Sequence, residues 1–319
     1  MRPTTKLRVR MACMAVATFY CCISYGFAQD KVVATIKPVH ALVAEVMGDT
    51  GAPELLVDGA SSPHSYIMKP SDAAKLASAG IIFRVSPTIE PFTVKAARTL
   101  AKSTEMVTLQ SAPGVATLPQ RLGGPFDAHD HDHEHGHDTE SHTAAGAIDG
   151  HVWLNPDNAK AMLDEIARRL AARAPAFAAT YATNAAAAKA RIDALTADLS
   201  NQIAPVVGKP YVVFHDAYQY FEKRFGLNVV GSITIDPEIP PSGKRLSGLR
   251  QRIASLGALC VFGEPNFDAK VIAVVTEGTK ARSGILDPEG AALTAGPDLY
   301  DKLMRSLASG LVKCLSPPA

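Results

Sequence analysis

Residues 174–204 read APAFAATYATNAAAAKARIDALTADLSNQIA, and this stretch organises the chain around it. It has no proline or glycine from 176 to 204, so a helix could run unbroken for about 43 Å at ~1.5 Å per residue. Its apolar residues recur every three or four positions and share one face: Phe177, Tyr181, Ala185, Ala188, Ile192, Leu195, Leu199 and Ile203. This pattern is typical of an ordinary packed helix, and also of a stiff spine that joins two lobes.

The chain on either side of this helix alternates short apolar runs with helical patterns. The runs that predict strands are KVVATI (31–36), PELLVDG (53–59), IIFRVS (81–86), PYVVFHD (210–216), NVVGSI (228–233), ALCVFGEP (258–265) and SGILDPEG (283–290). A β–α–β order is typical of a parallel sheet covered by helices on both faces. We therefore expect an α/β fold of two lobes, 29–175 and 205–319, each with a mostly parallel sheet flanked by helices. Residues 176–204 would be the linking helix.

The N-terminus resembles a secretory signal. Residues 1–10 contain four basic residues and no acid, an apolar run follows, and small residues stand at Gly26 and Ala28. These features predict a signal peptide at 1–28, cleaved after Ala28. A transmembrane anchor would need about 20 apolar residues, and a lipid anchor would need a small residue, rather than Tyr20, before Cys21.

Charge and cysteine content limit the partners and the cysteine chemistry that can be expected of the mature chain. The full chain has 32 basic and 31 acidic residues, so loss of residues 1–28 leaves a formal charge of −3. This balance argues against nucleic acid or an anionic membrane surface as a partner. Of five cysteines, only Cys260 and Cys314 remain after the signal. In an exported protein they predict a disulfide worth about 4 kcal/mol, although two buried thiols are the alternative.

Residues 127–142, DAHDHDHEHGHDTESH, contain six of the ten histidines: His129, His131, His133, His135, His137 and His142. The surrounding segment, about 120–147, has no periodicity and little to bury, so we expect a disordered loop. A tight metal site needs ligands in fixed positions. We therefore expect this tract to bind several ions weakly, as an accessory to a better site.

Four other residues predict that better site. His64 lies in a polar loop, His151 in the rigid-looking segment DGHVWLNP, His215 directly after a strand, and Asp287 after another strand. Ligands of open α/β sheets bind beyond the carboxyl ends of the strands, so such residues can meet between two lobes. His40 lies inside a helical pattern, and we expect it to pack or to support the site.

Five stretches carry a family resemblance, which covers nearly the whole mature chain in order. They are VATIKPVHALVAEVMG (33–48), DGASSPHSYIMKPSDAAKLASA (58–79), DGHVWLNPDNAKAM (149–162), VVFHDAYQYFEKRFGL (212–227) and CVFGEPNFDAKVI (260–272) with LDPEG (286–290). Together they resemble the zinc-binding proteins of ABC importers, of the ZnuA type within cluster A-I. The resemblance implies two α/β lobes, a linking backbone helix and a metal in the interlobe cleft.

The resemblance also implies site residues. The metal histidines of the family fall on His64, His151 and His215, the carboxylate of the second lobe falls on Asp287, and the family disulfide falls on Cys260 and Cys314. The chain departs from some members at Pro63, where they carry a glutamate that can reach the ion. The fourth ligand is then Asp287 or water.

Three imidazoles and one oxygen favour Zn²⁺, whereas manganese prefers more oxygen ligands. Manganese-binding relatives have a glutamate at the position of His215. We therefore expect a non-enzymatic, monomeric periplasmic protein that carries Zn²⁺ as cargo to an ABC permease of the inner membrane. The alternatives are a zinc buffer or adhesin without an importer, and a zinc hydrolase. The chain contains no HExxH motif and no evident nucleophile–base pair to support the hydrolase.

Deletion of residues 127–142 tests the accessory role of the tract. The deleted protein should keep one tightly bound zinc ion and lose the weaker extra ions, because a loop must lose conformational entropy to bind while a preformed cleft does not. Chelator competition measures both. If tight binding disappears with the tract while His64, His151 and His215 remain, the tract is the site.

Overall fold

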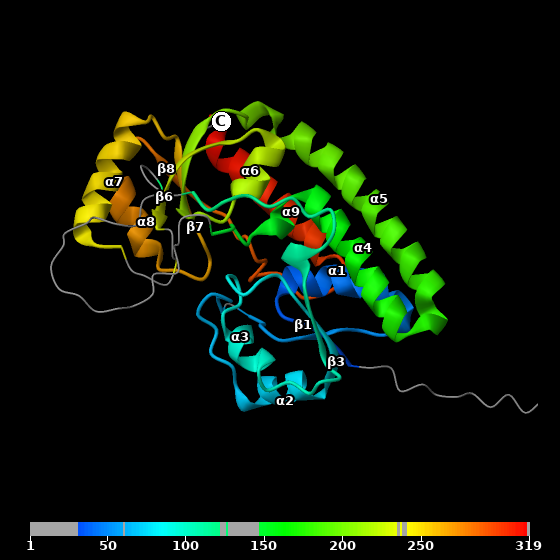
Figure 1. The fold of residues 1–319 in the computed structure, drawn as a ribbon. Helices are drawn as coiled ribbons and strands as arrows, with labels where there is room; N and C mark the ends of the chain where they lie inside the picture. The colour runs from blue at the N-terminus through cyan, green and yellow to red at the C-terminus, as the bar shows by residue number, and fades with distance from the viewer. Residues whose placement is uncertain are drawn as a thin grey trace, which may run out of the picture.

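The computed structural model describes residues 31–59, 61–121, 126, 147–234, 237 and 241–317. The predicted signal peptide (1–28) and the histidine tract (127–142) lie outside these residues. Within them the chain forms two four-stranded sheets, each entirely parallel (Figure 1). The prediction of a two-lobed α/β fold is confirmed. The boundaries 29–175, 176–204 and 205–319 stay a prediction.

The sheet of the first lobe has the order β2-β1-β3-β4. Its elements are β1 (Lys31–Ala34), α1 (Lys37–Met47), β2 (Glu54–Leu55), α2 (Pro70–Ser78), β3 (Ala79–Arg84), α3 (Phe92–Ala97) and β4 (Glu105–Thr108). Successive residues of β3 face opposite sides: Ile81 and Phe83 join the central core, and Ile82 packs in the small cluster under α2 and α3. Strand β4 was not predicted, because its sequence EMVT has only two apolar residues, Met106 and Val107, between polar ones.

The sheet of the second lobe has the order β6-β5-β7-β8. Its elements are β5 (Pro210–His215), α6 (Gln219–Phe225), β6 (Asn228–Thr234), α7 (Gly243–Ser255), β7 (Cys260–Gly263), α8 (Ala269–Thr276), β8 (Arg282–Ile285) and α9 (Leu299–Leu315). Helices α7 and α8 cover the outer face over Val212 and Val261. Tyr211 and Phe262 point to the other face and join the central core.

Helices α4 (Pro156–Arg173) and α5 (Ala178–Ile203) connect the lobes, and α5 runs along one side of the molecule (Figure 1). Asn155 begins α4 by accepting a hydrogen bond from Asp157 N. Seven of the eight predicted face residues of α5 are buried; Phe177 is 39 % exposed, because it belongs to the short 3₁₀ turn Pro175–Phe177 before the helix.

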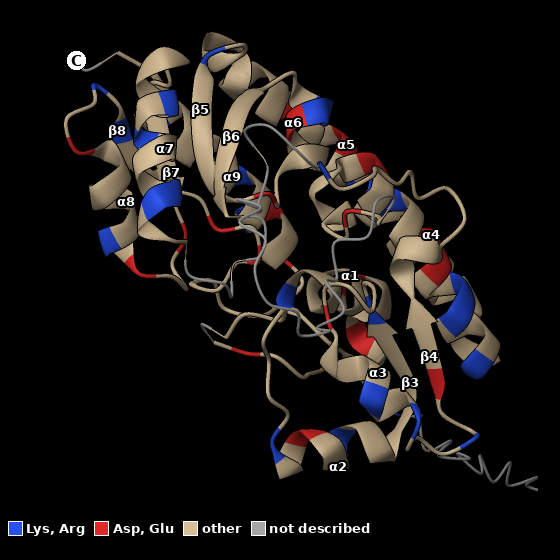
Figure 2. Cartoon of the chain, turned by 60° about the vertical axis from the view of Figure 1, so that its left-hand side comes forward, with Lys and Arg blue, Asp and Glu red and all other residues tan. Residues whose placement is uncertain are grey.

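The packing of α5 joins the two lobes into one core. It contacts α1 and α4 of the first lobe and α9 of the second, and a single hydrophobic cluster includes residues of both sheets. Charged residues occur along α2, α4 and α7 (Figure 2). Exposed ion pairs, Lys160–Asp193 and Lys189–Asp164, also link α4 to α5, but such pairs contribute at most about 1 kcal/mol. Among the described helices, none is both long and apolar enough to cross a membrane.

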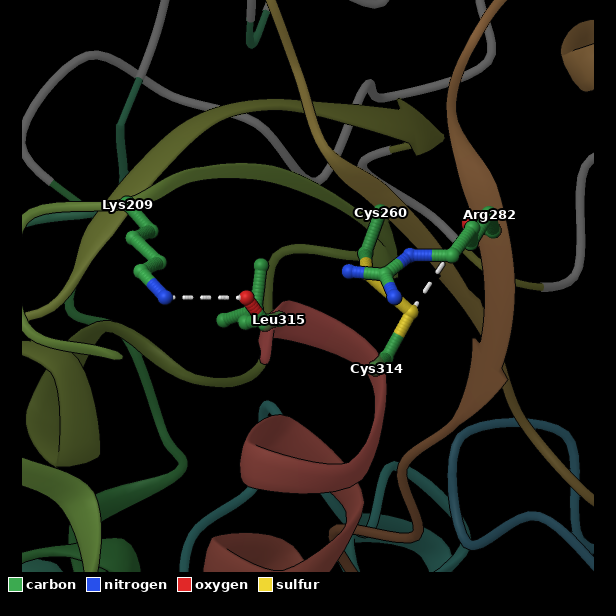
Figure 3. The surroundings of a disulfide bond; sticks show 5 residues. All are labelled: Lys209, Cys260, Arg282, Cys314 and Leu315. Carbon is green, nitrogen blue, oxygen red and sulfur yellow. Dashed lines mark hydrogen bonds between the residues drawn. A yellow bond between two sulfur atoms is a disulfide. The ribbon is translucent and has the colours of Figure 1, made fainter. Parts of the chain in front are cut away.

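The predicted disulfide is confirmed. Cys260 at the start of β7 is bonded to Cys314 near the end of α9, with 6.2 Å between their Cα atoms (Figure 3). Lys209 Nζ donates a hydrogen bond to Leu315 O at 3.1 Å, so the same end of α9 is held by two links. The disulfide therefore ties the helix that enters the central core to the sheet of the second lobe.

Candidate metal centre

Three of the predicted ligands lie in loops or at the end of a strand. His64 lies in the loop between β2 and α2 and is half-buried. His151 precedes the short 3₁₀ turn Val152–Leu154, whose three side chains are buried. His215 is the last residue of β5. The structure brings these three histidines together, and their role as metal ligands stays a prediction.

The three imidazoles come together with the spacing of a metal site. One ring nitrogen from each of His64, His151 and His215 lies within 4.8 Å of the other two. His151 Nε2 and His215 Nε2 are 3.4 Å apart. Two nitrogens that each lie ~2.05 Å from a tetrahedral zinc ion are separated by about 3.3 Å, so this pair already has the required distance.

Carboxylates fix the orientation of two of the rings. His151 Nδ1 is 2.8 Å from Asp149 Oδ1, and His215 Nδ1 is 2.7 Å from Glu264 Oε1. If each Nδ1–H donates to its carboxylate, each Nε2 lone pair is available to a metal. The hydroxyl of Tyr218 in turn donates a hydrogen bond to Glu264 Oε1 at 3.2 Å. Both rings are therefore held by partners outside the group of ligands.

The surroundings decide the protonation of each histidine. Burial, with the neighbouring histidines, lowers the pKa of His64 and of His151 well below 6.5. Burial also opposes a charge on His215, but Glu264 outweighs it, so the pKa of His215 is raised. His64 Nε2 is buried and has no hydrogen-bond partner among the described residues. Such an unpaired polar atom costs free energy, which a bound cation would remove.

Asp287 does not join the three histidines in this structure. Its Oδ1 accepts hydrogen bonds from Glu289 N (3.1 Å) and Gly290 N (2.8 Å), and its Oδ2 accepts one from Ala292 N (3.3 Å). The carboxylate thus organises its own loop. Its role as fourth ligand stays a prediction, with water as the alternative.

The histidines line a narrow cavity together with Asp149, Arg121 and Asp216. Arg121 forms ion pairs with Asp216 and with Glu222. Arg121 is also the last described residue before 122–125. Two backbone hydrogen bonds join this flank to the flank after the tract: Gln120 N donates to Ala147 O (2.8 Å), and Asp149 N donates to Leu118 O (2.9 Å). The segments that flank the histidine tract therefore meet at the wall of this cavity, while the tract itself lies outside the described residues.

His40 lies apart from the three histidines, and two carboxylates that were not predicted lie beside them. His40 lies in α1 with its Nε2 3.1 Å from Pro53 O, and it is not part of the histidine group. No role was predicted for Asp149 or Glu264 from the sequence. Both were within reach, because Asp149 stands two residues before His151 and Glu264 directly follows β7 at the edge where His215 ends β5. A carboxylate at such a place is the usual partner of a metal-binding imidazole.

The fold and the buried histidine group define a two-lobed metal-binding protein. Residues 32–314 match the model of a family described as the periplasmic component A of the zinc-uptake complex. The chain belongs to this family, which confirms the resemblance found in the sequence.

Named relatives agree with this assignment. The protein named high-affinity zinc uptake system protein ZnuA of Brucella suis biovar 1 is 43 % identical, with 93 % of this chain and 95 % of that protein aligned. The ZnuA protein of Yersinia pestis is 33 % identical, with 91 % and 93 % aligned.

Solved structures show the same fold. A crystal structure of ZnuA superposes with a TM-score of 0.74 at 22 % identity and covers 90 % of this chain and 99 % of that one. The FpvC protein of Pseudomonas aeruginosa, solved with Mn²⁺, has a TM-score of 0.76 at 19 % identity, with 90 % and 98 % covered. At these identities the likeness concerns the fold alone.

The variant His215→Ala tests the histidine group. It should weaken zinc binding by orders of magnitude, because it removes one ligand and the geometry that the ligand imposes. The fold should persist, since neither the core nor the disulfide depends on an ion. His40→Ala is the matched control and should bind zinc as the wild type does. Calorimetry that finds tight binding in His215→Ala would refute the site.

Proposed function

We propose that this protein captures Zn²⁺ in the periplasm, after loss of residues 1–28, and delivers it as a monomer to an ABC permease of the inner membrane. The observation that carries the proposal is the convergence of His64, His151 and His215 on one point between the lobes. Membership of a zinc-uptake family supports the same cargo.

The chemistry of the donors favours zinc over manganese. Three nitrogen ligands at compact spacing suit a four-coordinate tetrahedral ion, whereas Mn²⁺ is better served by several oxygens. Two of the imidazoles are backed by carboxylates, Asp149 and Glu264. Each carboxylate contacts the Nδ1 of an imidazole whose Nε2 could bind the ion, so it would support that ligand without occupying a coordination position.

Capture and release follow from where the ligands stand. His64 and His151 belong to segments of the first lobe, and His215 ends the central strand β5 of the second. An ion bound by all three bridges the lobes. A permease that separates these segments by even about 1 Å would break the zinc–nitrogen geometry, because those bonds have a narrow optimum.

Two alternatives remain distinct in their chemistry. A zinc hydrolase needs a general base beside the metal. In the described part of the chain, the two carboxylates that contact the histidines, Asp149 and Glu264, are engaged with imidazole nitrogens. A periplasmic buffer or adhesin would use the same site without a permease. One structure of this fold, from Streptococcus agalactiae, is described as bifunctional with adhesin and metal transporting activity.

Uptake of radioactive zinc by whole cells separates the importer from the buffer. Cells that lack this protein should recover uptake in chelator-treated medium when given the wild type, and His215→Ala should fail to restore it. Removal of the cognate permease should abolish the recovery. Recovery that persists without any ABC permease would contradict delivery to an importer.

Zinc affinity should fall as the pH drops through the pKa of His215. His64 and His151 stay neutral near pH 7 because their pKa values are well below 6.5. The pKa of His215 is raised, so its proton competes with zinc already near neutral pH. Below that pKa the affinity should decrease about tenfold per pH unit, as measured by chelator competition.

The variant Glu264→Gln provides the control. Without the Glu264 carboxylate, burial is opposed only by the smaller effects of Asp216 and Asp149, so the pKa of His215 falls and the onset of the decrease should move to lower pH. An affinity that is constant from pH 8 to pH 5 in the wild type would be incompatible with a three-histidine site.

A further inference from the structure

Lys37 occupies an unusual place at the boundary between the lobes. It is the first residue of α1 and is only 7 % exposed. Lysine is almost never buried without partners, and a cation at a helix N-terminus is opposed by the helix dipole. The first turn of α1 contains no acidic residue to compensate. The position therefore lowers the stability of α1 unless other contacts offset it.

The contacts of Lys37 lie in the second lobe. Its Nζ donates hydrogen bonds to Ala291 O and Leu293 O, both at 2.8 Å, and lies 3.5 Å from Gly290 O. We call residues 287–293, which follow β8, the strap. The ammonium is also 3.5 Å from Asp58, at the start of the loop that carries His64. Lys37 thus joins the strap of the second lobe to a ligand-bearing loop of the first.

Trp153 ties the strap to the first lobe a second time. Its Nε1 donates a hydrogen bond to Pro288 O at 2.9 Å, and its backbone O accepts one from the hydroxyl of Tyr300 in α9. The ring of Trp153 is 5.3 Å from the ring of His151, measured between centroids. The strap is therefore one side chain away from a proposed ligand.

The strap also lies near the other side of the site. The pKa of Tyr218 is raised well above its ordinary value by burial, by Glu264 and by the charge of Asp287. Tyr218 donates to Glu264, which holds His215. Asp287 keeps the strap in shape through its three backbone hydrogen bonds. The strap therefore contacts Trp153, which lies beside His151, and the charge of its Asp287 acts on Tyr218, which supports the Glu264–His215 pair. It supplies no ligand in this structure.

We propose that the strap is a latch that retains the bound ion, and that Lys37 and Trp153 are the positioning residues that hold it against the first lobe. This inference rests on the proposed capture of zinc between the lobes. Separation of His215 from His64 and His151 requires the strap to leave Lys37 and Trp153. The rate of zinc dissociation is then limited by the breaking of these hydrogen bonds. The rate of association is not limited by this step.

The test compares zinc release from Lys37→Met with release from two matched controls. Lys75 Nζ donates to Leu55 O within the first lobe, and Lys209 Nζ donates to Leu315 O within the second, so each makes a lysine–carbonyl bond that does not cross between lobes. Stopped-flow mixing of the zinc-loaded proteins with excess chelator gives the dissociation rate.

Lys37→Met should release zinc at least about tenfold faster than the wild type, because charged hydrogen bonds to the strap are lost. Lys75→Met and Lys209→Met should release it at the wild-type rate. Trp153→Phe keeps an aromatic ring against His151 but removes the donor to Pro288, and it should also accelerate release. The dissociation rate of Trp153→Phe therefore tests the latch independently if Lys37→Met folds poorly.

Fluorescence gives a readout that a general loss of stability would not move. Trp153 is the chain's single tryptophan. In zinc-free Lys37→Met, loosening of the strap should make it more accessible to acrylamide at temperatures where the protein is fully folded. The two control variants should quench as the wild type does.

The outcomes separate this inference from the proposed function. Tight zinc binding by the wild type, with unchanged release from both Lys37→Met and Trp153→Phe, would overturn the latch alone. A wild type that binds no zinc tightly would overturn the proposed function and the latch with it.

Discussion

The rest of the structure depends on one continuous hydrophobic core between the two sheets. Helices α1, α4, α5 and α9 pack against one another between the two sheets, and residues of both sheets belong to the same hydrophobic cluster. A packed interior changes its arrangement only in discrete steps, because it has almost no free volume. The distance between the lobes is thereby fixed to within small displacements, and a site made from both lobes can keep its dimensions without an ion.

This constraint explains how ligands so far apart in sequence can act together. His64, His151 and His215 each stand on a short segment whose base is in or beside that core, and hydrogen bonds from Asp149 and Glu264 set two of the rings. Little ordering is then left for the ion to accomplish, which favours tight binding. The same rigidity implies that release involves local movement at the seam, such as the strap, more readily than a wide hinge opening. Domain closure through a flexible linker would need a different connection from α5.

The sequence predicted the fold well because its signals are local and repeated. Seven strands and the face of α5 follow from apolar periodicity, which each segment displays by itself. Strand β4 was not predicted, because EMVT has only two adjacent apolar residues between polar ones. Phe177 was misplaced because the helix begins only after the 3₁₀ turn Pro175–Phe177. The three histidines followed from their places at strand ends and from the family resemblance. The supports Asp149 and Glu264 stand where local sequence could have indicated them, two residues before His151 and directly after strand β7. The strap and Lys37 instead depend on contacts between distant parts of the chain, which no local pattern contains. The role of Asp287 as fourth ligand stays a prediction, since its carboxylate here accepts hydrogen bonds from the backbone of Glu289, Gly290 and Ala292.

The backbone bridge between Pro119 and Ile148 has a consequence for how the family can vary. It closes the segment from 120 to 147 at its base, next to the cavity, before any ligand is involved. The entropy of closing a flexible loop grows only with the logarithm of its length, by about 0.6 kcal/mol for each doubling. Insertions or deletions between the two sides of the bridge should therefore leave the folded body almost equally stable. Evolution, or a protein engineer who wishes to graft a reporter or an affinity peptide, can change the content of this segment while the metal centre a few residues away keeps its shape.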